Sequence, residues 1–290
     1  MSVHTTNPFK LSIDKISFTF NDISSLHAQK TYDHLIAMEQ RHSMTLRSCA
    51  RYRLQAKFSI MGSASSLLIQ TGPRNEGVQD HRIEFTPSKQ DAAGRDQIRE
   101  IINSVTGIGF DQVMAVGKVT RIDVALDLPG LSLEEVIIRS DRQRTFGAFS
   151  NSQGDIENCY LGKPKANRTS CYTKKNRKLH DQWLRLERQM RPNQLGSGLL
   201  SMANPFECVH MVSTATIEPY LDPLNSQWFF DSVRLRGWTR VVKMLGLKQA
   251  RAITAALKDP TQTLLPPMAQ IWASWPRTVH EGLWGDAAPI

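Results

Sequence analysis

The stretch that decides the fold is ENCYLGKPKANRTSCYTKKNRKLHDQWLRLERQMR, residues 157–191. At the two-residue period of a β-strand, WLRLERQM puts both leucines on one face and Arg185 and Glu187 on the other. Read the same way, SCYTKK puts Tyr172 and Lys174 on a common face. A phenol and an ammonium group near an arginine and a carboxylate indicate a surface that handles phosphate. The alternative is a solvated basic hairpin without chemistry.

The positive charge of the chain is concentrated in and around this stretch. The 290 residues have a formal net charge of +9, and residues 139–191 hold 13 Lys and Arg against 5 Asp and Glu, whereas residues 1–138 hold 15 of each kind. Such a region is typical of a surface that binds a polyanion, because neutralised phosphates release counterions. Many basic proteins bind no nucleic acid, so this charge needs a second signal beside it.

The cysteines and the apolar runs indicate the compartment. The four cysteines form no CxxC pair and no zinc-like spacing with histidine, which predicts reduced, mostly buried thiols. The first ten residues lack the charge and apolar run of a signal peptide, and no stretch approaches the roughly 20 apolar residues of a membrane span. We therefore expect a soluble cytoplasmic protein without a membrane partner.

Outward from the opening stretch, hydrophobic periodicity predicts an α+β protein with antiparallel sheets and a helical C-terminal region. Strands are predicted over residues 11–20, 51–62, 66–73, 81–87, 118–128, 144–150, 158–163, 170–175, 183–191 and 205–212. Helices are predicted over residues 27–41, 91–104, 131–140, 228–247 and 247–260, followed by a partly ordered tail that packs through its tryptophans. The domain boundaries expected from this pattern are 1–115, 116–220 and 221–290.

Three strands of the first half resemble three strands of the second half in the same order. SIDKISFTF resembles RIDVALDL, SLLIQTGP resembles NCYLGKPK, and HRIEF resembles LRLER. This alignment pairs Asp14 with Asp123 and Glu84 with Glu187, and gives Tyr172 no counterpart. It predicts two duplicated β-rich halves, of which only the second is catalytically complete. Chance similarity among short amphipathic strands is the alternative.

Four motifs, RIDVALDL, CYLGKP, SCYTKK and WLRLERQMR, occur in the order found in a known family. Together they resemble the Rep_trans-type rolling-circle replication initiation proteins of plasmids and phages, which are related to the relaxases of mobile elements. The resemblance covers residues 11 to about 220. It implies a site-specific endonuclease that nicks and rejoins one DNA strand at an origin through a covalent 5′-phosphotyrosine.

In that resemblance Tyr172 is the nucleophile, and Lys174 neutralises the phosphate or helps to deprotonate the phenol. A phenol has an unperturbed pKa near 10, so cations or a metal ion must favour the phenolate at neutral pH. Tyr160 is the rival, but its neighbours look like those of a packed strand end. The chain departs from the family pattern at Lys175 and Asn176, where many relatives have glycine and a nearby acid, which leaves the local acid-base assistance open.

The resemblance also implies a divalent cofactor, Mg²⁺ or Mn²⁺, with Asp123, Asp127 and Glu187 as its ligands. Four strand residues span about 13 Å, so the two aspartates cannot both ligate one ion unless the strand bulges. For each carboxylate the alternative is a structural ion pair with Arg121 or Arg185.

The expected partner is origin DNA, single-stranded or extruded, together with a host helicase and polymerase and, as an open alternative, a second copy of the chain. Cations on and beside the motifs are the predicted DNA contacts: Arg121, Lys163, Lys165, Arg168, Lys175, Arg177, Lys178 and Arg185. The C-terminal cations are one candidate for choosing the origin, with a packing domain as the alternative. Two other functions remain open: a non-catalytic DNA-binding regulator or accessory replication protein, and a metal-dependent nuclease that uses water.

Overall fold

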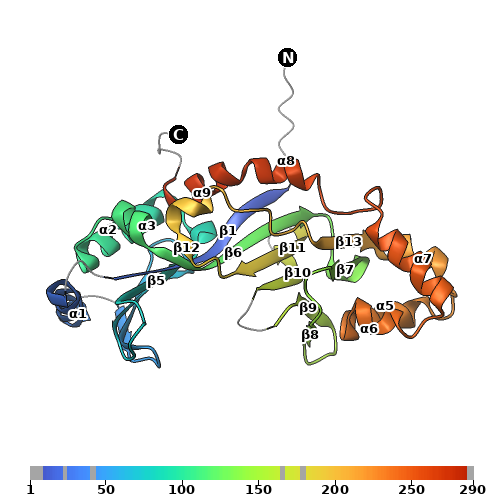
Figure 1. Ribbon diagram of the computed structural model, residues 1–290, viewed down its shortest axis with the longest axis horizontal. Helices are drawn as coiled ribbons and strands as arrows, with labels where there is room; N and C mark the ends of the chain where they lie inside the picture. The colour runs from blue at the N-terminus through green and yellow to red at the C-terminus, as the bar shows by residue number, and fades with distance from the viewer. Residues whose placement is uncertain (1–8, 22–24, 40–43, 164–166, 177–180, 286–290) are drawn as a thin grey trace, which may run out of the picture. The chain divides into compact units, whose positions relative to one another are not determined.

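A computed structural model describes residues 9–21, 25–39, 44–163, 167–176 and 181–285 (Figure 1). The predicted α+β class with a helical C-terminal region is confirmed. The strands are β1 (Lys10–Phe20), β2 (Met44–Arg47), β3 (Tyr52–Ser59), β4 (Ser66–Pro73), β5 (His81–Phe85), β6 (Lys118–Pro129), β7 (Val136–Ser140), β8 (Phe146–Ser150), β9 (Ile156–Leu161), β10 (Arg168–Asn176), β11 (Asp181–Met190), β12 (Gln194–Leu195) and β13 (Val209–Ser213). The α-helices are α1 (Ser25–Glu39), α2 (Ala92–Thr106), α3 (Phe110–Val116), α4 (Thr214–Ile217), α5 (Ser226–Arg236), α6 (Trp238–Val242), α7 (Leu247–Lys258), α8 (Met268–Ala273) and α9 (Trp275–Leu283).

Hydrogen bonds order the strands as β2-β3-β4-β5-β1-β6-β11-β10-β9-β8, with β12 also paired to β6. The order outward from β1 is β5, β4, β3, β2, and the order outward from β6 is β11, β10, β9, β8. Within the large sheet, each half thus has one strand and a four-strand meander whose last strand pairs back to it; in the second half β7, which belongs to the separate sheet, precedes the meander. This identical connectivity agrees with the predicted duplication, but it corrects one correspondence: β4 matches β10, and β3 matches β9.

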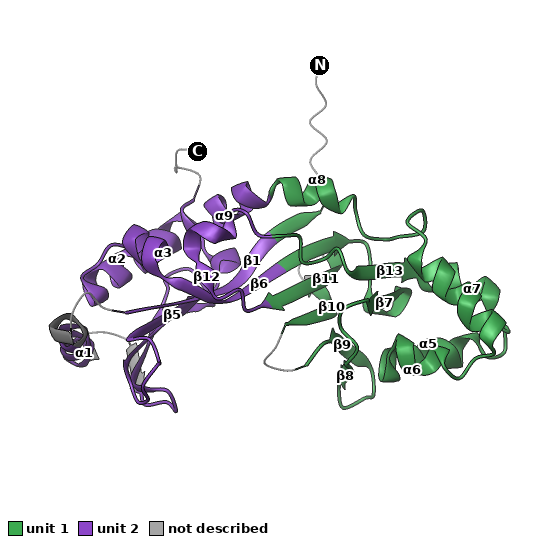
Figure 2. Ribbon diagram, viewed as in Figure 1, with its two compact units in different colours: residues 1–11, 125–189, 203–274 green, residues 12–124, 190–202, 275–290 purple. Residues whose placement is uncertain are grey.

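Contacts divide the chain into two compact units (Figure 2). Unit 1 comprises residues 1–11, 125–189 and 203–274, and unit 2 comprises residues 12–124, 190–202 and 275–290. The division falls within three strands: between residues 11 and 12 in β1, between 124 and 125 in β6, and between 189 and 190 in β11. The three segments predicted from the sequence place their boundaries elsewhere, at residues 115 and 220.

In unit 2, β3 alternates buried and exposed residues, as expected of a strand with one face on a core. In unit 1, β6 ends in an unbroken buried run from Ala125 to Leu128, as expected of a strand covered on both faces. The tail also packs through indoles, as predicted, but as helices: in unit 2, Trp275 is buried and its Nε1 donates to the Leu199 carbonyl at 2.6 Å.

A second core in unit 1 joins β7 and β13 to the C-terminal helices. Its buried residues are Ile137, Val212, Ile217, Phe229, Phe230, Val233, Trp238, Val241, Ile253, Ala256 and Leu257. The chain between α5 and α6 turns at Gly237, whose φ of 82° lies in the region that glycine adopts readily. A Cβ on Gly237 would lie 2.5 Å from Cγ of Phe146, so the turn also brings the backbone against β8.

We expect Gly237→Ala to lower the free energy of unfolding by about 2–4 kcal/mol, because it adds both backbone strain and an overlap with Phe146. Urea denaturation measures this change. Gly246→Ser is the control, since a Cβ at Gly246 meets nothing within 4 Å and its φ is −59°. Equal stabilities for the two variants would contradict the packing described for the turn.

Three predicted elements are corrected. The helix predicted over residues 131–140 does not form: Ser132 and Glu135 make a capping box, but it closes one 3-10 turn, and β7 follows. The strand predicted over residues 205–212 is shorter, β13, and it pairs with β7 in a separate two-stranded sheet. The helix expected over residues 228–247 is split at Gly237 into α5 and α6. Among the helices of the described ranges, none combines the length and apolar character needed to cross a bilayer.

Candidate active site

The candidate site lies on one face of the β10–β11 pair in unit 1. The antiparallel register places Tyr172 opposite Arg185 and Lys174 opposite Trp183, so the faces predicted from the sequence do meet across the two strands. The Tyr172 hydroxyl donates to Oε2 of Glu187 at 3.0 Å. The tyrosine is half-buried, which leaves it accessible to a ligand from solvent.

The opposite face of the same strands anchors them in the core. Cys171, Leu184 and Leu186 are each no more than 1% exposed. Burial raises the pKa of the Cys171 thiol, which keeps this sulfur protonated and unreactive although it is next to the tyrosine. The alternation therefore places the phenol on the face opposite the core, on a strand that the buried side chains anchor.

Arg185 joins the site to the neighbouring strand β6. Its Nε and Nη2 donate to the two carboxylate oxygens of Asp127, both at 2.6 Å, and both side chains are largely buried. Such a bidentate pair fixes the guanidinium in one orientation. Arg185 was predicted to contact DNA, but its burial makes it a residue that positions the Tyr172 strand instead.

The other predicted DNA contacts differ in accessibility. Lys163 and Lys175 are exposed, Lys174 is half-buried, and Arg168 lies over the Tyr160 ring at 5.1 Å from its centroid. Lys165, Arg177 and Lys178 lie outside the described residues. The predicted contacts that the structure describes at or near the surface thus lie on the Tyr172 strand and in the connection before it.

In unit 2, Asp123 is buried and accepts hydrogen bonds from Arg121, the closest at 2.6 Å. Burial raises the pKa of Asp123, and its bonds to Arg121 only partly oppose that effect. Arg121 and Asp123 therefore form a structural ion pair, which was the alternative to metal ligation by Asp123.

The three predicted metal ligands do not gather into one cluster. Across the described residues, no group of three or more His, Cys, Asp or Glu side chains is arranged to hold an ion. Asp127 is paired with Arg185, which leaves Glu187 as the predicted ligand that contacts Tyr172. Mg²⁺ commonly binds through one or two carboxylates, several waters and the phosphates of its substrate, so an ion held by Glu187 would have its coordination completed by water and DNA phosphates.

The matching position in the first half has no phenol. Gln70 on β4 lies opposite Arg82 on β5, as Tyr172 lies opposite Arg185, and Arg82 donates to Oε1 of Gln70 at 2.9 Å. Glu84 corresponds to Glu187, as predicted, and bonds to Ser17 at 2.7 Å as well as to Arg82. The first half therefore keeps the arginine and the carboxylate but lacks the nucleophile.

The Glu84 cluster predicts a pH-dependent contribution to stability. Burial opposes ionisation of Glu84, but Arg82, Ser17 and Lys15 outweigh it and lower its pKa below 4.5. A carboxylate with a lowered folded-state pKa stabilises the fold above its unfolded pKa and loses that contribution as the pH falls through the folded value. We expect Glu84→Gln to cost about 1–2 kcal/mol at pH 7 and progressively less below pH 4.5.

Urea denaturation of the wild type and Glu84→Gln between pH 7 and pH 3 measures the effect. Glu76→Gln is the control, because Glu76 is exposed and makes no ion pair among the described residues. A stability difference for Glu84→Gln that stays constant across this range would contradict the assignment.

A hollow of about 770 Å³ borders Tyr172 and was not foreseen from the sequence. Its charged lining consists of Glu134, Asp155 and Glu157 against Lys175. These acids come from two separate segments, Glu134 before β7 and the other two at the start of β9, so no local motif indicated them. Their excess makes the hollow unfavourable for a phosphate chain.

No protein family model matches the chain, and no curated protein matches it either.

Proposed function

We propose that the protein nicks one DNA strand and rejoins it through a covalent 5′-phosphotyrosine on Tyr172, and so initiates rolling-circle replication. The observation that carries the proposal is the 3.0 Å hydrogen bond from the Tyr172 hydroxyl to Oε2 of Glu187. It puts a proton acceptor on the phenol, which is the first requirement for a tyrosine nucleophile. The phenol is only half-buried, so it is accessible to a DNA strand from solvent.

The transfer would proceed by exchange of phosphate esters. The phenol gives its proton to Glu187 as its oxygen bonds to phosphorus, the P–O3′ bond breaks, and the 3′ oxygen leaves as a hydroxyl after taking a proton from solvent. The number of phosphodiester bonds is unchanged, so the reverse attack by a 3′-hydroxyl reseals the strand without a nucleotide cofactor. The released 3′-hydroxyl can prime a polymerase, which with a helicase is the host partner that this proposal requires.

Mg²⁺ or Mn²⁺ belongs to the proposal, with Glu187 as the ligand best placed to hold it. A bound ion would polarise the non-bridging phosphate oxygens and stabilise charge in the transition state. Lys174, on the same face as Tyr172, contributes a second positive charge to the phosphate.

The path of the strand follows from the distribution of charge around Tyr172. Arg168 lies four residues before Tyr172 and Lys174 two residues after it, so all three share one face of the strand. The adjoining hollow, by contrast, has an acidic lining. We therefore expect the phosphates to run along the Arg168–Lys174 face. Contacts of this kind add affinity rather than sequence preference.

Glu187→Gln is expected to slow adduct formation about 10²–10⁴-fold, because it removes the proton acceptor and a metal ligand while preserving side-chain size. The assay incubates the protein with Mg²⁺ or Mn²⁺ and a 3′-labelled pool of single-stranded oligonucleotides of randomised sequence, and follows label that stays with the protein in denaturing gels. EDTA gives the metal-free control.

Two outcomes would replace the proposal. Salt-sensitive binding with no adduct under either ion identifies the non-catalytic DNA-binding regulator or accessory protein. Cleavage without trapped protein, dependent on Glu187 and indifferent to Tyr172, identifies a nuclease that uses water.

A further inference from the structure

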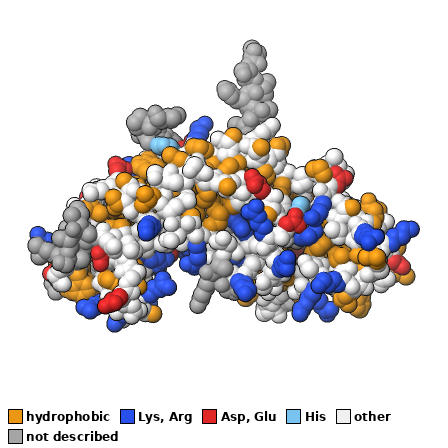
Figure 3. Space-filling model, viewed as in Figure 1, with side chains coloured by type: hydrophobic (Ala, Val, Ile, Leu, Met, Phe, Trp, Pro, Cys, Tyr) orange, Lys and Arg blue, Asp and Glu red, His pale blue; other side chains and the backbone are white. Residues whose placement is uncertain are grey.

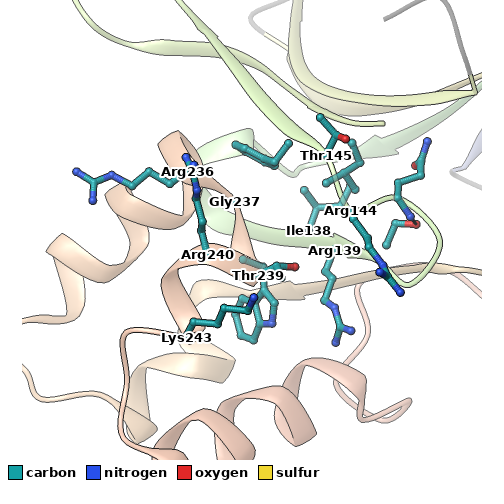
Figure 4. Close-up of a pocket in the computed structure, with 14 residues that line it drawn as sticks. Ile138, Arg139, Arg144, Thr145, Arg236, Gly237, Thr239, Arg240 and Lys243 are labelled. Atoms are coloured by element: carbon teal, nitrogen blue, oxygen red, sulfur yellow. Dashed lines mark hydrogen bonds between the residues drawn. The ribbon is translucent and has the colours of Figure 1, made fainter. Parts of the chain in front are cut away.

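A separate pocket of about 340 Å³ lies in unit 1 between the β7–β8 segment and the α5–α6 turn (Figure 4). Arg139 and Arg144 come from the strand side, and Arg236, Arg240 and Lys243 come from the helical side. About one hundred residues separate these two groups in the sequence, and the fold brings them around one cavity. The residues that line it include no aspartate or glutamate.

Most of these cations have no acidic partner. Within the described ranges, no ion pair or side-chain hydrogen bond is made by Arg144, Arg236, Arg240 or Lys243. Arg139 pairs through Nη2 with Asp141 at 3.0 Å, while its Nη1 is buried without a hydrogen-bond partner. A buried guanidinium nitrogen without an acceptor is unfavourable, and an anion bound at Arg139 would supply that acceptor.

The walls of the pocket are held in place by packing. Gly237 and the buried Trp238 fix the turn that carries Arg236 and Arg240. On the other side, Gln143 donates to the Asn167 carbonyl at 2.7 Å and accepts from Thr169 Oγ1 at 2.6 Å. The cations are therefore presented from rigid elements, which lowers the entropy cost of binding.

The chemistry of the lining selects a phosphate group. Guanidinium groups match phosphate oxygens through paired N–H donors, and an ammonium group adds a point charge. The surface agrees with this, since Lys and Arg outnumber the acidic side chains on the unit 1 part of the face shown in Figure 3. We propose that this pocket binds a backbone phosphate of a DNA strand at a position separate from Tyr172.

This second contact would hold the DNA while the strand at Tyr172 is cut and rejoined, but phosphate binding in the pocket does not depend on that chemistry. The binding experiment therefore uses EDTA, so that no cleavage is required. Fluorescence anisotropy with a labelled single-stranded oligonucleotide, repeated over a range of salt concentrations, gives the slope of log affinity against log salt. A free phosphorylated molecule is the other source of the same ligand chemistry, and pyrophosphate is its probe.

The test variant is Arg144→Gln with Arg240→Gln, since both side chains are exposed at the pocket and neither has a structural partner among the described residues. The matched control is Lys248→Gln with Arg251→Gln, which removes the same charge from exposed positions of α7 outside the pocket. The pocket variant should reduce the salt slope by about 0.7, because the pocket is proposed to hold one phosphate and each phosphate contact on single-stranded DNA contributes about 0.7. The control should leave the slope near that of the wild type.

Pyrophosphate binding is measured as the rise in melting temperature that pyrophosphate causes. If the pocket variant alone loses this rise while its salt slope is unchanged, the pocket is a phosphate site for a free phosphorylated ligand. Equal effects of the pocket and control variants on both measurements, or no effect of either, would overturn the proposal.

Discussion

Tyr172→Phe is expected to abolish the covalent protein–DNA adduct and to reduce nicking by at least about 10⁴-fold, because it removes the attacking oxygen. The ring stays in place, and the fold loses one hydrogen bond, to Glu187, worth about 1 kcal/mol. DNA binding should change little, so anisotropy in EDTA should report nearly the affinity of the wild type. Adduct gels with Mg²⁺ and Mn²⁺ measure the loss.

Tyr160→Phe is the matched control. Tyr160 is on the neighbouring strand β9, opposite Ser170 of β10, and the Arg168 guanidinium lies over its ring. Removing its hydroxyl leaves that ring contact intact, so adduct formation should remain within a few-fold of the wild type. An adduct that persists in Tyr172→Phe and disappears in Tyr160→Phe would transfer the nucleophile to Tyr160.

Asp127→Ala is expected to destabilise the fold by about 3–5 kcal/mol, because it leaves the Arg185 guanidinium buried without its carboxylate. Replacing both partners, as Asp127→Leu with Arg185→Met, should recover much of that loss, since neither charge then remains in the interior. Urea denaturation with Mg²⁺ and with EDTA provides the measurement, and the two conditions should give the same difference from the wild type.

The control for the buried pair is Asp231→Ala, which breaks the more exposed pair with Arg234 and should cost no more than about 1 kcal/mol. If Asp127→Ala is as mild as this control, the ion pair is not the structural element described above. A destabilisation seen only with Mg²⁺ would instead make Asp127 a metal ligand.

The faces of the central strands could be predicted from alternation. In the segment from Lys118 to Leu128 and in WLRLERQM, apolar and polar residues alternate over enough positions to assign both faces. The two structural ion pairs, Arg121 with Asp123 and Arg185 with Asp127, were foreseen as alternatives to metal ligation. Periodicity cannot choose between a pair and a ligand, because both place the carboxylate on the same face.

The elements that could not be predicted have identifiable physical reasons. The capping box at Ser132 is a true helix-start signal, but the β-branched run after it packs as the strand β7. The strand that matches Tyr172 in the first half depends on hydrogen-bonded register, which short amphipathic strands do not encode individually. For the same reason Gln70 could be identified as the counterpart of the tyrosine only from the pairing of β4 with β5.

The basic pocket depends even more on tertiary structure. The excess of Lys and Arg in residues 139–191 was visible, and the cations of α5 and α6 were noted separately. No local pattern indicated that Arg139 and Arg144 line the same cavity as Arg240 and Lys243. Charge counts locate a basic region, but only the fold decides which of its side chains line one pocket.

Mapping the DNA-linked peptide by mass spectrometry tests the central claim most directly. Trypsin cleaves after Arg168 and Lys174, so Tyr172 lies in the peptide of residues 169–174, and Tyr160 lies in a different peptide. After reaction with Mg²⁺ or Mn²⁺ and nuclease trimming, we expect the nucleotide mass on residues 169–174, at the tyrosine. A nucleotide on the Tyr160 peptide, or no linked peptide with either ion, would contradict the account.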